Sequence, residues 1–248
     1  MLEVKCILCP VDFSEFSVRA YRHALSMAEH YRAKLITQHV VELWRYPAAS
    51  FAASALLYDE YRESLRANGM EQLQEFVKNH THSDVQSNLV VDDGITSELI
   101  LSFAQEQKSD LIIMGTHGQR GFDRLMLGSV TERVMRRAIC PVVVVREPPH
   151  DLAAAGDEQH YTHRLDRVLA CTDFSEDSER ALDYAISGAA EYDAELTLVH
   201  ILEKAPSSKH TGQAIAEATE QRADALHPSV YGNFSRNTVR TASASERG

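Results

Sequence analysis

Short apolar runs alternate with longer amphipathic segments over the first 147 residues of the chain. An apolar run bounded by turn residues is typical of a strand buried on both faces, and apolar positions three and four apart are typical of a helix packed on one side. The runs predict strands at residues 4–11, 34–41, 85–91, 111–114 and 141–145. The amphipathic segments predict helices at residues 15–31, 59–79, 96–107 and 129–137.

Strand and helix alternate throughout this series, which predicts an α/β fold with a parallel sheet covered by helices on both faces. Ser14, with the apolar Phe13 before it, is expected to cap the first helix. Thr96 or Ser97 is expected to cap the third. Residues 44–57 are apolar and rich in Ala, and we expect a connection there.

The beginning of the series recurs later in the chain. Asp12-Phe13-Ser14-Glu15 is matched by Asp173-Phe174-Ser175-Glu176, and further identities follow at the same spacing without a gap. Such a match indicates an internal duplication. The second copy is incomplete, because nothing in it corresponds to residues 85–146.

The duplication divides the chain into four expected regions. Residues 1–147 form one complete domain, and residues 148–162, which begin with two prolines, form a linker. Residues 163–227 form the truncated second copy. Residues 228–248 are rich in Ser, Thr, Arg and Asn, and we expect this tail to be disordered.

The chain is acidic, with a formal net charge of −11 and a pI near 5.5. This charge argues against nonspecific binding to nucleic acid and against docking on an anionic membrane. The N-terminal residues do not read as a secretory signal, and no apolar run is long enough to span a bilayer. We therefore expect a cytoplasmic protein.

The most informative motif is Gly115-Thr116-His117-Gly118, followed after nine residues by Gly128-Ser129. It lies between an expected strand and an expected helix, as in many phosphate-binding sites. It is neither a Walker A motif nor the dinucleotide fingerprint. Its place after the fourth strand of the series, where open α/β sheets bind ligands, indicates a bound nucleotide.

Each residue of this motif has a binding interpretation and a plain structural one. Gly115, Gly118 and Gly128 allow the backbone to approach sugar and phosphates, or they only make turns. Ser129 offers a hydroxyl to phosphate, with the amides of Val130 and Thr131 assisting, or it caps the helix.

Other polar residues near the motif are also open to two interpretations. His117 contacts ribose or phosphate, or is a turn residue, and Arg120 could pair with phosphate. Asp12, at the end of the first strand, accepts a hydrogen bond from an adenine amine or a ribose hydroxyl, or is an acidic residue favoured by the helix dipole.

Three further groups are expected to be structural. Cys6 and Cys9 form a Cys-x-x-Cys pair inside a strand, where they point to opposite faces, so buried apolar residues are favoured over a zinc or redox site. His39 is expected to have a structural role. Asp92 and Asp93 are expected to form a turn rather than a metal site.

These residues together resemble the universal stress protein family. The resemblance covers residues 1–147 fully and residues 163–226 in part, and Gly-x-x-Gly, nine residues, Gly-Ser marks the ATP-binding branch of that family. It implies a doubly wound five-stranded parallel sheet of order 3-2-1-4-5. The segments that carry the resemblance are residues 10–14, 39–40, 114–118, 128–130 and 141–145.

The resemblance also implies a ligand and a set of contacts. ATP would lie between the ends of the first and fourth strands, with Mg²⁺ or Mn²⁺ held by its phosphates and not directly by the protein. The residues that would line adenine and ribose are Pro10, Val11, Asp12 and Val40. Those that would hold ribose and phosphates are Met114, Gly115, Gly118, Gly128, Ser129 and Val130.

Members of the family commonly dimerise through the fifth strand, and tandem members form the same pairing within one chain. Because this second copy lacks a fifth strand, we expect two chains to pair through residues 141–145 as a homo-oligomer. The truncated copy would then dock elsewhere.

Three functions are compatible with these residues. The first is an ATP-binding stress-response regulator whose occupancy changes its oligomeric state or its partners. The second is a slow ATPase or phosphotransferase, which is disfavoured because no P-loop lysine and no catalytic base can be assigned. The third is an adaptor that needs no nucleotide.

Overall fold

The computed structural model describes residues 3–42, 55–81, 84–116, 127–146 and 165–199. The chain divides into two compact units, one within residues 3–163 and the other formed mainly by residues 164–248. The elements of the first unit, in chain order, are β1 (Cys6–Pro10), α1 (Glu15–Tyr31), β2 (Lys34–Val41), α2 (Ala55–His80), β3 (Ser87–Asp93), α3 (Thr96–Glu106), β4 (Leu111–Gly115), α4 (Ser129–Arg137) and β5 (Val142–Val145).

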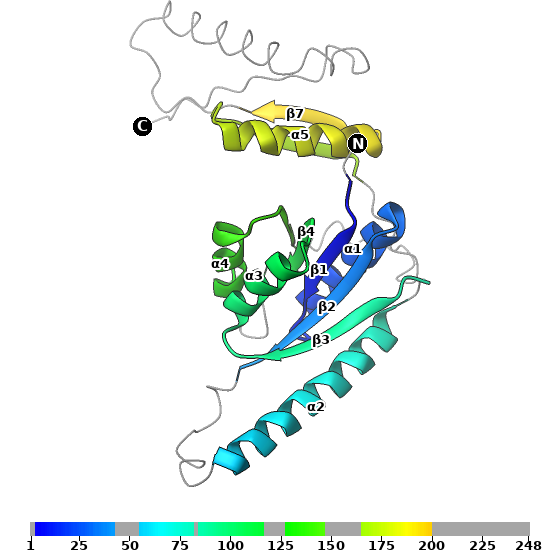
Figure 1. Ribbon diagram of the computed structural model, residues 1–248. Helices are drawn as coiled ribbons and strands as arrows, with labels where there is room; N and C mark the ends of the chain where they lie inside the picture. Colours follow the sequence, from blue (N-terminus) through cyan, green and yellow to red (C-terminus); the bar gives the residue numbers. More distant parts are fainter. Residues whose placement is uncertain (1–2, 43–54, 82–83, 117–126, 147–164, 200–248) are drawn as a thin grey trace, which may run out of the picture. The chain divides into compact units, whose positions relative to one another are not determined.

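The five strands of the first unit form one parallel sheet in the order β3-β2-β1-β4-β5, of which Figure 1 labels β1 to β4. The α/β fold and the strand order expected from the sequence are therefore confirmed. β1 lies at the centre, where the chain first winds outward to β2 and β3 and then returns to β4 and β5. In such sheets the carboxyl ends of the two central strands flank the usual place for a ligand.

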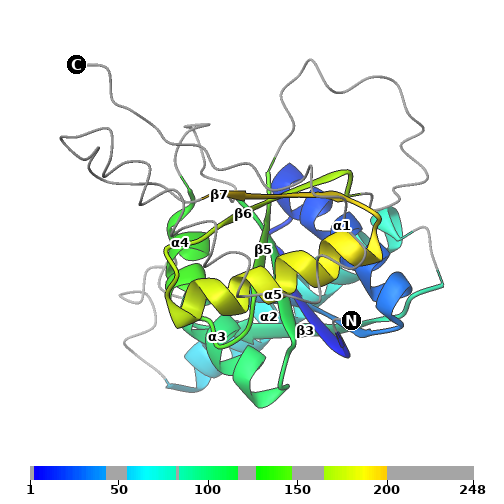
Figure 2. The ribbon, with the colours of Figure 1, turned by 90° about the horizontal axis from the view of Figure 1, so that it is seen from above.

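Helices cover both faces of this sheet. Helix α1 packs on β1, β2 and β4 and α2 packs on β2 and β3, whereas α3 and α4 pack against each other. Figure 2 shows α1 and α4 on opposite sides of β5. The core beneath α3 and α4 is built from buried side chains of these helices and of three strands, namely Cys6, Leu8, Ile36, Ile100, Ala104, Ile112, Met114 and Val134.

Helix α1 begins where the sequence predicts, because its cap is local. Ser14 is the N-cap residue and accepts a hydrogen bond from the backbone N–H of Ser17 at 3.3 Å. The helix ends at Arg32, whose backbone adopts the left-handed conformation with φ of 53° and whose N–H bonds to the carbonyl oxygens of Ala28 and Glu29. Left-handed residues of this kind are common at helix C-termini.

The expected cap of helix α3 is wrong. Ile95 occupies the N-cap position, and no described side chain caps the helix. The Thr96 hydroxyl instead donates a 2.7 Å hydrogen bond to a carboxylate oxygen of Glu42, at the end of β2. A long-range charged acceptor therefore competes successfully with the local cap.

Two other boundaries differ from the expected ones. Helix α2 begins at Ala55, inside the expected connection, since Ala and Leu are strong helix formers. Strand β3 continues to Asp93, because its register with β2 runs as far as Val41. Asp92 and Asp93 therefore lie in a strand and not in a turn.

An aromatic cluster of two half-buried rings, Phe13 and His39, and the buried Phe76 joins the ends of β1 and β2. The ring of His39 lies 4.3 Å from that of Phe13, which in turn lies 5.7 Å from Phe76 of α2. His39 Nδ1 is 2.9 Å from the carbonyl oxygen of Val11. Burial lowers the pKa of His39, although the hydrogen bond to Val11 opposes this effect. The structural role expected for His39 agrees with these contacts.

The second unit contains β6 (Arg167–Cys171), α5 (Glu176–Glu191) and β7 (Glu195–Val199), with the two strands parallel. Its register repeats that of the first copy, since Arg167 pairs with Glu195 as Cys6 pairs with Lys34. Phe174, with φ of 63°, repeats the left-handed conformation of Phe13, with φ of 65°. The duplication is thus confirmed in backbone detail. The expected end of this copy at residue 227 and the expected tail lie outside the described residues.

The two copies differ in how their central strands are covered. Leu8 of β1 is fully buried, whereas its counterpart Leu169 of β6 is 64% exposed. Leu8 lies in the core beneath α3 and α4, and the described part of the second unit contains no counterpart of those helices.

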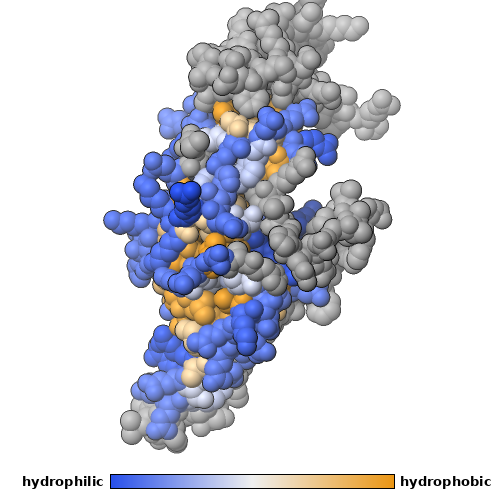
Figure 3. Space-filling model, turned by 90° about the vertical axis from the view of Figure 1, so that its right-hand side faces the viewer, coloured by the Kyte–Doolittle hydropathy of each residue, from blue (hydrophilic) through white to orange (hydrophobic). Residues whose placement is uncertain are grey.

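Figure 3 shows one face of the molecule, on which most described residues are hydrophilic and apolar residues are visible mainly in a patch near the middle of the view. In the part of the chain that the structure describes, no helix combines the length and the apolar character needed to cross a membrane. Cys6 and Cys9 are both buried and free, as expected for apolar packing residues.

The burial of His39 predicts acid sensitivity. In the unfolded chain its pKa returns to about 6.5, above the folded value, so the unfolded state takes up a proton that the folded state resists. The contribution of neutral His39 to the unfolding free energy is therefore complete above pH 6.5. It is lost as the pH falls below 6.5, by at most about 1.4 kcal/mol per pH unit.

The test is urea denaturation at pH 7.5 and pH 5.5 of the wild type and of His39→Phe. We expect the wild type to lose more unfolding free energy between the two pH values than the variant loses. An equal loss in both proteins would contradict the prediction.

Candidate functional site

The candidate site lies at the carboxyl ends of β1 and β4, where the first turn of α4 meets the sheet. Gly128 precedes this helix as its N-cap residue, and its N–H donates a 2.8 Å hydrogen bond to the carbonyl oxygen of Thr116. The Thr131 hydroxyl donates to the carbonyl oxygen of Gly115 at 2.9 Å. These two bonds fix the start of the helix against the end of the strand.

The N-terminus of α4 presents backbone donors at this position. The first N–H groups of any helix have no acceptor within the helix, and the helix dipole makes this end favourable for an anion. No described side chain caps α4. Ser129 is the first residue inside the helix, so the interpretation of Ser129 as the cap is wrong, and its hydroxyl is not needed for that purpose.

Packing explains why position 115 is a glycine, which the sequence alone did not reveal. A Cβ atom at this position would lie 2.9 Å from Cβ of Phe16 and 3.0 Å from the Phe16 carbonyl carbon and oxygen. The absence of a side chain thus lets the end of β4 approach the first turn of α1. Part of the glycine motif is explained by packing alone.

Asp12 is part of the turn between β1 and α1. Its Oδ1 accepts hydrogen bonds from the Ser14 N–H at 3.2 Å, the Ser14 hydroxyl at 2.6 Å and the Ser17 hydroxyl at 2.5 Å. Its own N–H donates to Ser17 Oγ at 2.9 Å. These contacts support the structural interpretation of Asp12 as a residue that shapes the start of the helix.

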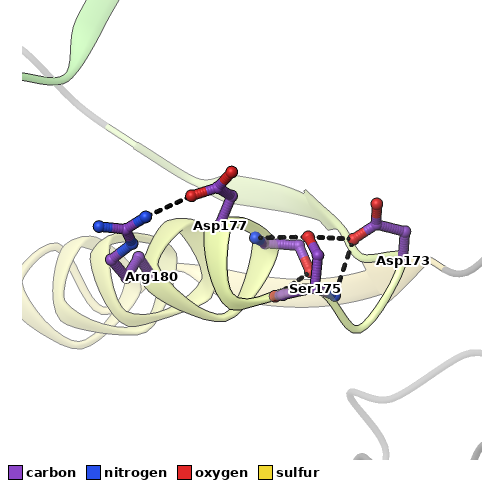
Figure 4. Close-up of polar contacts among 5 residues, drawn as sticks. Asp173, Ser175, Asp177 and Arg180 are labelled. Atoms are coloured by element: carbon purple, nitrogen blue, oxygen red, sulfur yellow. Dashed lines mark hydrogen bonds and ion pairs between the residues drawn. The ribbon is translucent and has the colours of Figure 1, made fainter. Parts of the chain in front are cut away.

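The same turn occurs in the second unit, as Figure 4 shows. Asp173 Oδ1 accepts from the Ser175 N–H at 3.0 Å and from the Ser175 hydroxyl at 2.6 Å. These hydrogen bonds lower the pKa of Asp173 to about 2. Asp177 forms an ion pair with Arg180 one turn further along α5.

The apolar candidates lie where the sequence places them. Val11 and Met114 are buried at the ends of their strands, Val40 is buried in β2, and Pro10 is half-buried at the end of β1. The N–H of Val11 donates to the carbonyl oxygen of Gln38 at 2.8 Å, which extends the pairing of β1 and β2 to the rim of the site.

A polar group next to Val40 was not recognised from the sequence. Gln38 is fully buried, and its Nε2 donates a 2.8 Å hydrogen bond to Oδ2 of Asp92 on β3. At the same end of β2, the carboxylate of Glu42 accepts a hydrogen bond from the hydroxyl of Thr96. The only signal in the sequence is that Gln38 stands between Thr37 and His39 at the centre of an expected strand.

His117, Gly118 and Arg120 lie outside the described residues. Within the ranges that the structure does describe, no group of three or more His, Cys, Asp or Glu side chains is placed to hold a metal ion. Asp93, for example, is paired with Arg62 of α2 at 2.7 Å and with Arg66 at 3.4 Å.

Comparison with known proteins identifies the family. The model of the universal stress protein family matches residues 3–146 and again residues 164–240. The chain belongs to the universal stress protein family. It contains two tandem domains of this type, which agrees with the duplication seen in the sequence and in the backbone of β1–α1–β2.

Individual relatives match different shares of the chain. Universal stress protein MJ0531 of Methanocaldococcus jannaschii is 34% identical over 144 residues, which are 58% of this chain and 83% of that protein. Universal stress protein YxiE of Bacillus subtilis is 27% identical over 146 residues, 56% of this chain and 97% of that protein. A solved universal stress protein from Archaeoglobus fulgidus shares the fold over 96% of this chain and 76% of its own, with a TM-score of 0.59 and 20% identity.

The contact between Gly115 and Phe16 predicts that Gly115→Ala destabilises the domain. The added methyl group must push the first turn of α1 away from β4, because backbone atoms of Phe16 block it. We expect a loss of about 1–3 kcal/mol of unfolding free energy, measured by urea denaturation followed by circular dichroism.

Gly188→Ala in helix α5 is the matched control, because a Cβ there meets no atom within 4 Å. It should be neutral or stabilising, since alanine favours the helix. Equal stability of Gly115→Ala and the wild type would show that the contact with Phe16 does not exclude a side chain at position 115.

Proposed function

We propose that the first domain binds an adenine nucleotide, ATP with Mg²⁺ or Mn²⁺, at the carboxyl ends of β1 and β4. The observation that carries the proposal is the uncapped N-terminus of α4, held against the end of β4 by Gly128 and Thr131. Nucleotide occupancy would then regulate the oligomeric state or the partners of this universal stress protein.

The phosphate end of the site is proposed at α4. The amides of Ser129, Val130 and Thr131 and the hydroxyl of Ser129 are the donors, whereas the Thr131 hydroxyl is already bonded to Gly115. Gly128 leaves room for the phosphates in front of these amides. The metal ion would be held by phosphate oxygens, because the described residues offer no cluster of ligands for it.

The base and ribose are proposed at the ends of β1 and β2. The residues that would line them are Pro10, Val11, Asp12 and Val40, while Met114 and Gly115 on β4 would contact ribose and phosphates. His117, Gly118 and Arg120, from the loop before Gly128, are proposed to contact ribose or phosphate as the family resemblance implies.

Binding is favoured over turnover. Catalysis of phosphoryl transfer needs a residue that orients the nucleophile. The acidic residue in the first turn of α4 is Glu132, and its carboxylate pairs with the Arg136 guanidinium at 3.0 Å on the exposed side of the helix. This observation supports a regulatory role rather than a rapid ATPase.

The proposal predicts stabilisation by ATP. If ATP with Mg²⁺ binds only the folded state, a concentration 100-fold above Kd adds roughly 2.7 kcal/mol to the unfolding free energy. We expect Gly128→Val to abolish this gain while the protein still folds, because the valine side chain would obstruct the space before α4. Thermal denaturation with and without ATP measures both effects.

Gly188→Ala serves as the control variant that retains the stabilisation by ATP. Mass spectrometry of the purified protein would identify a retained nucleotide. Stability that is unchanged by ATP at millimolar concentration would overturn the proposal. Release of phosphate over hours by the ATP-bound protein would favour the ATPase instead.

We further propose that two chains associate through β5. This strand is an edge of the sheet, and three of its four valine side chains are only half-buried. The carbonyl oxygens of Pro141 and Val145 bond to β4, through the N–H groups of Ile112 and Thr116. Since a parallel ladder alternates along a strand, Val142 and Val144 direct their backbone groups to the open edge.

Removing one of these outward N–H groups should dissociate the dimer. Val144→Pro removes it without breaking a bond to β4, and proline is tolerated on edge strands in this orientation. Light scattering coupled to size exclusion should give a dimer for the wild type and for Val144→Thr, which keeps the N–H, and a monomer for Val144→Pro. A monomeric wild type at micromolar concentration would contradict the pairing.

A further inference from the structure

Gln38 is a buried polar residue within the apolar core of the sheet. Its side chain is fully shielded from solvent, and its neighbours in the strand register are Pro10 on β1 and Val90 on β3. A buried amide is stable only when its donors and acceptor are both satisfied, so each polar atom of Gln38 needs a partner.

Only one side of this amide is satisfied. Nε2 donates to Oδ2 of Asp92 at 2.8 Å. Oε1 is buried, and in the part of the chain that the structure describes it has no hydrogen-bond donor. An unsatisfied buried acceptor destabilises the protein, so Oε1 requires a donor that the described residues do not supply, and a bound ligand can supply it.

The position of Gln38 indicates what this partner is. Ile36 belongs to the core beneath α3 and α4, and side chains alternate along a strand, so Gln38 and Val40 lie on that same face. The N-terminus of α4 lies on this face as well, beyond β1 and β4. A ligand with its phosphates at α4 that extends across β1 therefore reaches β2 with its base.

The orientation of the amide is set by Asp92. Because the two polar atoms of a carboxamide diverge, a nitrogen aimed at β3 leaves the oxygen directed away from β3, on the side of β1 and the proposed site. Asp92 is in this sense a positioning residue. Its carboxylate can only accept, so it holds the nitrogen and excludes the flipped amide.

We propose that Gln38 selects the base of the bound nucleotide, with Oε1 accepting a hydrogen bond from the 6-amino group of adenine. This inference rests on the nucleotide site proposed above. Adenine carries a donor at position 6, whereas guanine carries an acceptor there. Guanine would face the unsatisfied Oε1 with a second acceptor, and sites built on a hydrogen bond reject ligands that cannot make it.

The experiment compares two ligands that differ only in this amino group. Binding of ATP and of purine riboside 5′-triphosphate, each with Mg²⁺, is measured by isothermal titration calorimetry for the wild type and for Gln38→Leu. We expect the wild type to bind ATP about tenfold more tightly than the analogue, as one net hydrogen bond requires. The variant should bind both ligands equally, and the wild type should bind GTP more weakly than ATP.

The outcomes separate this inference from the proposed function. If the wild type binds no ATP, the nucleotide site itself is wrong. If it binds ATP and the analogue equally, or if Gln38→Leu keeps the preference for ATP, the site stands and the role of Gln38 is overturned.

The comparison of ligands in the wild type needs no variant, and Gln38→Met provides a second apolar replacement of similar volume if Gln38→Leu fails to fold. Asp92→Ala tests the positioning role. It should reduce the preference for ATP over the analogue, whereas a merely structural residue would change stability and leave this ratio unaltered.

Discussion

Two hydrogen bonds between the end of β4 and the first turn of α4 determine the geometry of the candidate site. Helix α4 has only nine residues, and a helix of this length is marginal in water without tertiary contacts. Its position therefore depends on the bonds made by Gly128 and Thr131 and on the fully buried side chain of Val134. These anchors use the carbonyl oxygens of β4 and leave the amides at the start of the helix available for a ligand.

Glycine occurs at positions 115 and 128 of the motif for different physical reasons. Gly115 is required where β4 meets Phe16, whatever the ligand. Gly128 has φ of −61° and ψ of 142°, a conformation open to every residue, so its backbone does not require glycine. In the proposed site, glycine at this position would leave room for the phosphates in front of the amides of α4, whereas Gly115 is explained by packing.

Elements with local signals were predictable from the sequence, and those set by distant contacts were not. The bounds of α1 follow from its cap and its apolar periodicity, and those of β2 and α4 follow from the apolar pattern within the segments themselves. The end of β3 depends on its register with β2 and on the ion pair of Asp93 with Arg62. Gln38 was overlooked because its partner, Asp92, lies 54 residues away, and the run from Lys34 to Val41 by itself predicts only a strand.

Comparison of the two copies distinguishes residues required for the fold from residues proposed for the nucleotide site. Asp173 and Ser175 repeat the turn of Asp12 and Ser14, with the same backbone conformation, although the described part of that unit contains no counterpart of β4 and α4. The turn is thus a property of the β1–α1 connection, which both copies retain to start a helix. Gln38 is replaced by Val199 in the repeated register, so the buried amide is absent where the helix that would bind phosphate is absent from the described residues. What the two copies share accounts for the fold, and what differs between them coincides with the proposed nucleotide site.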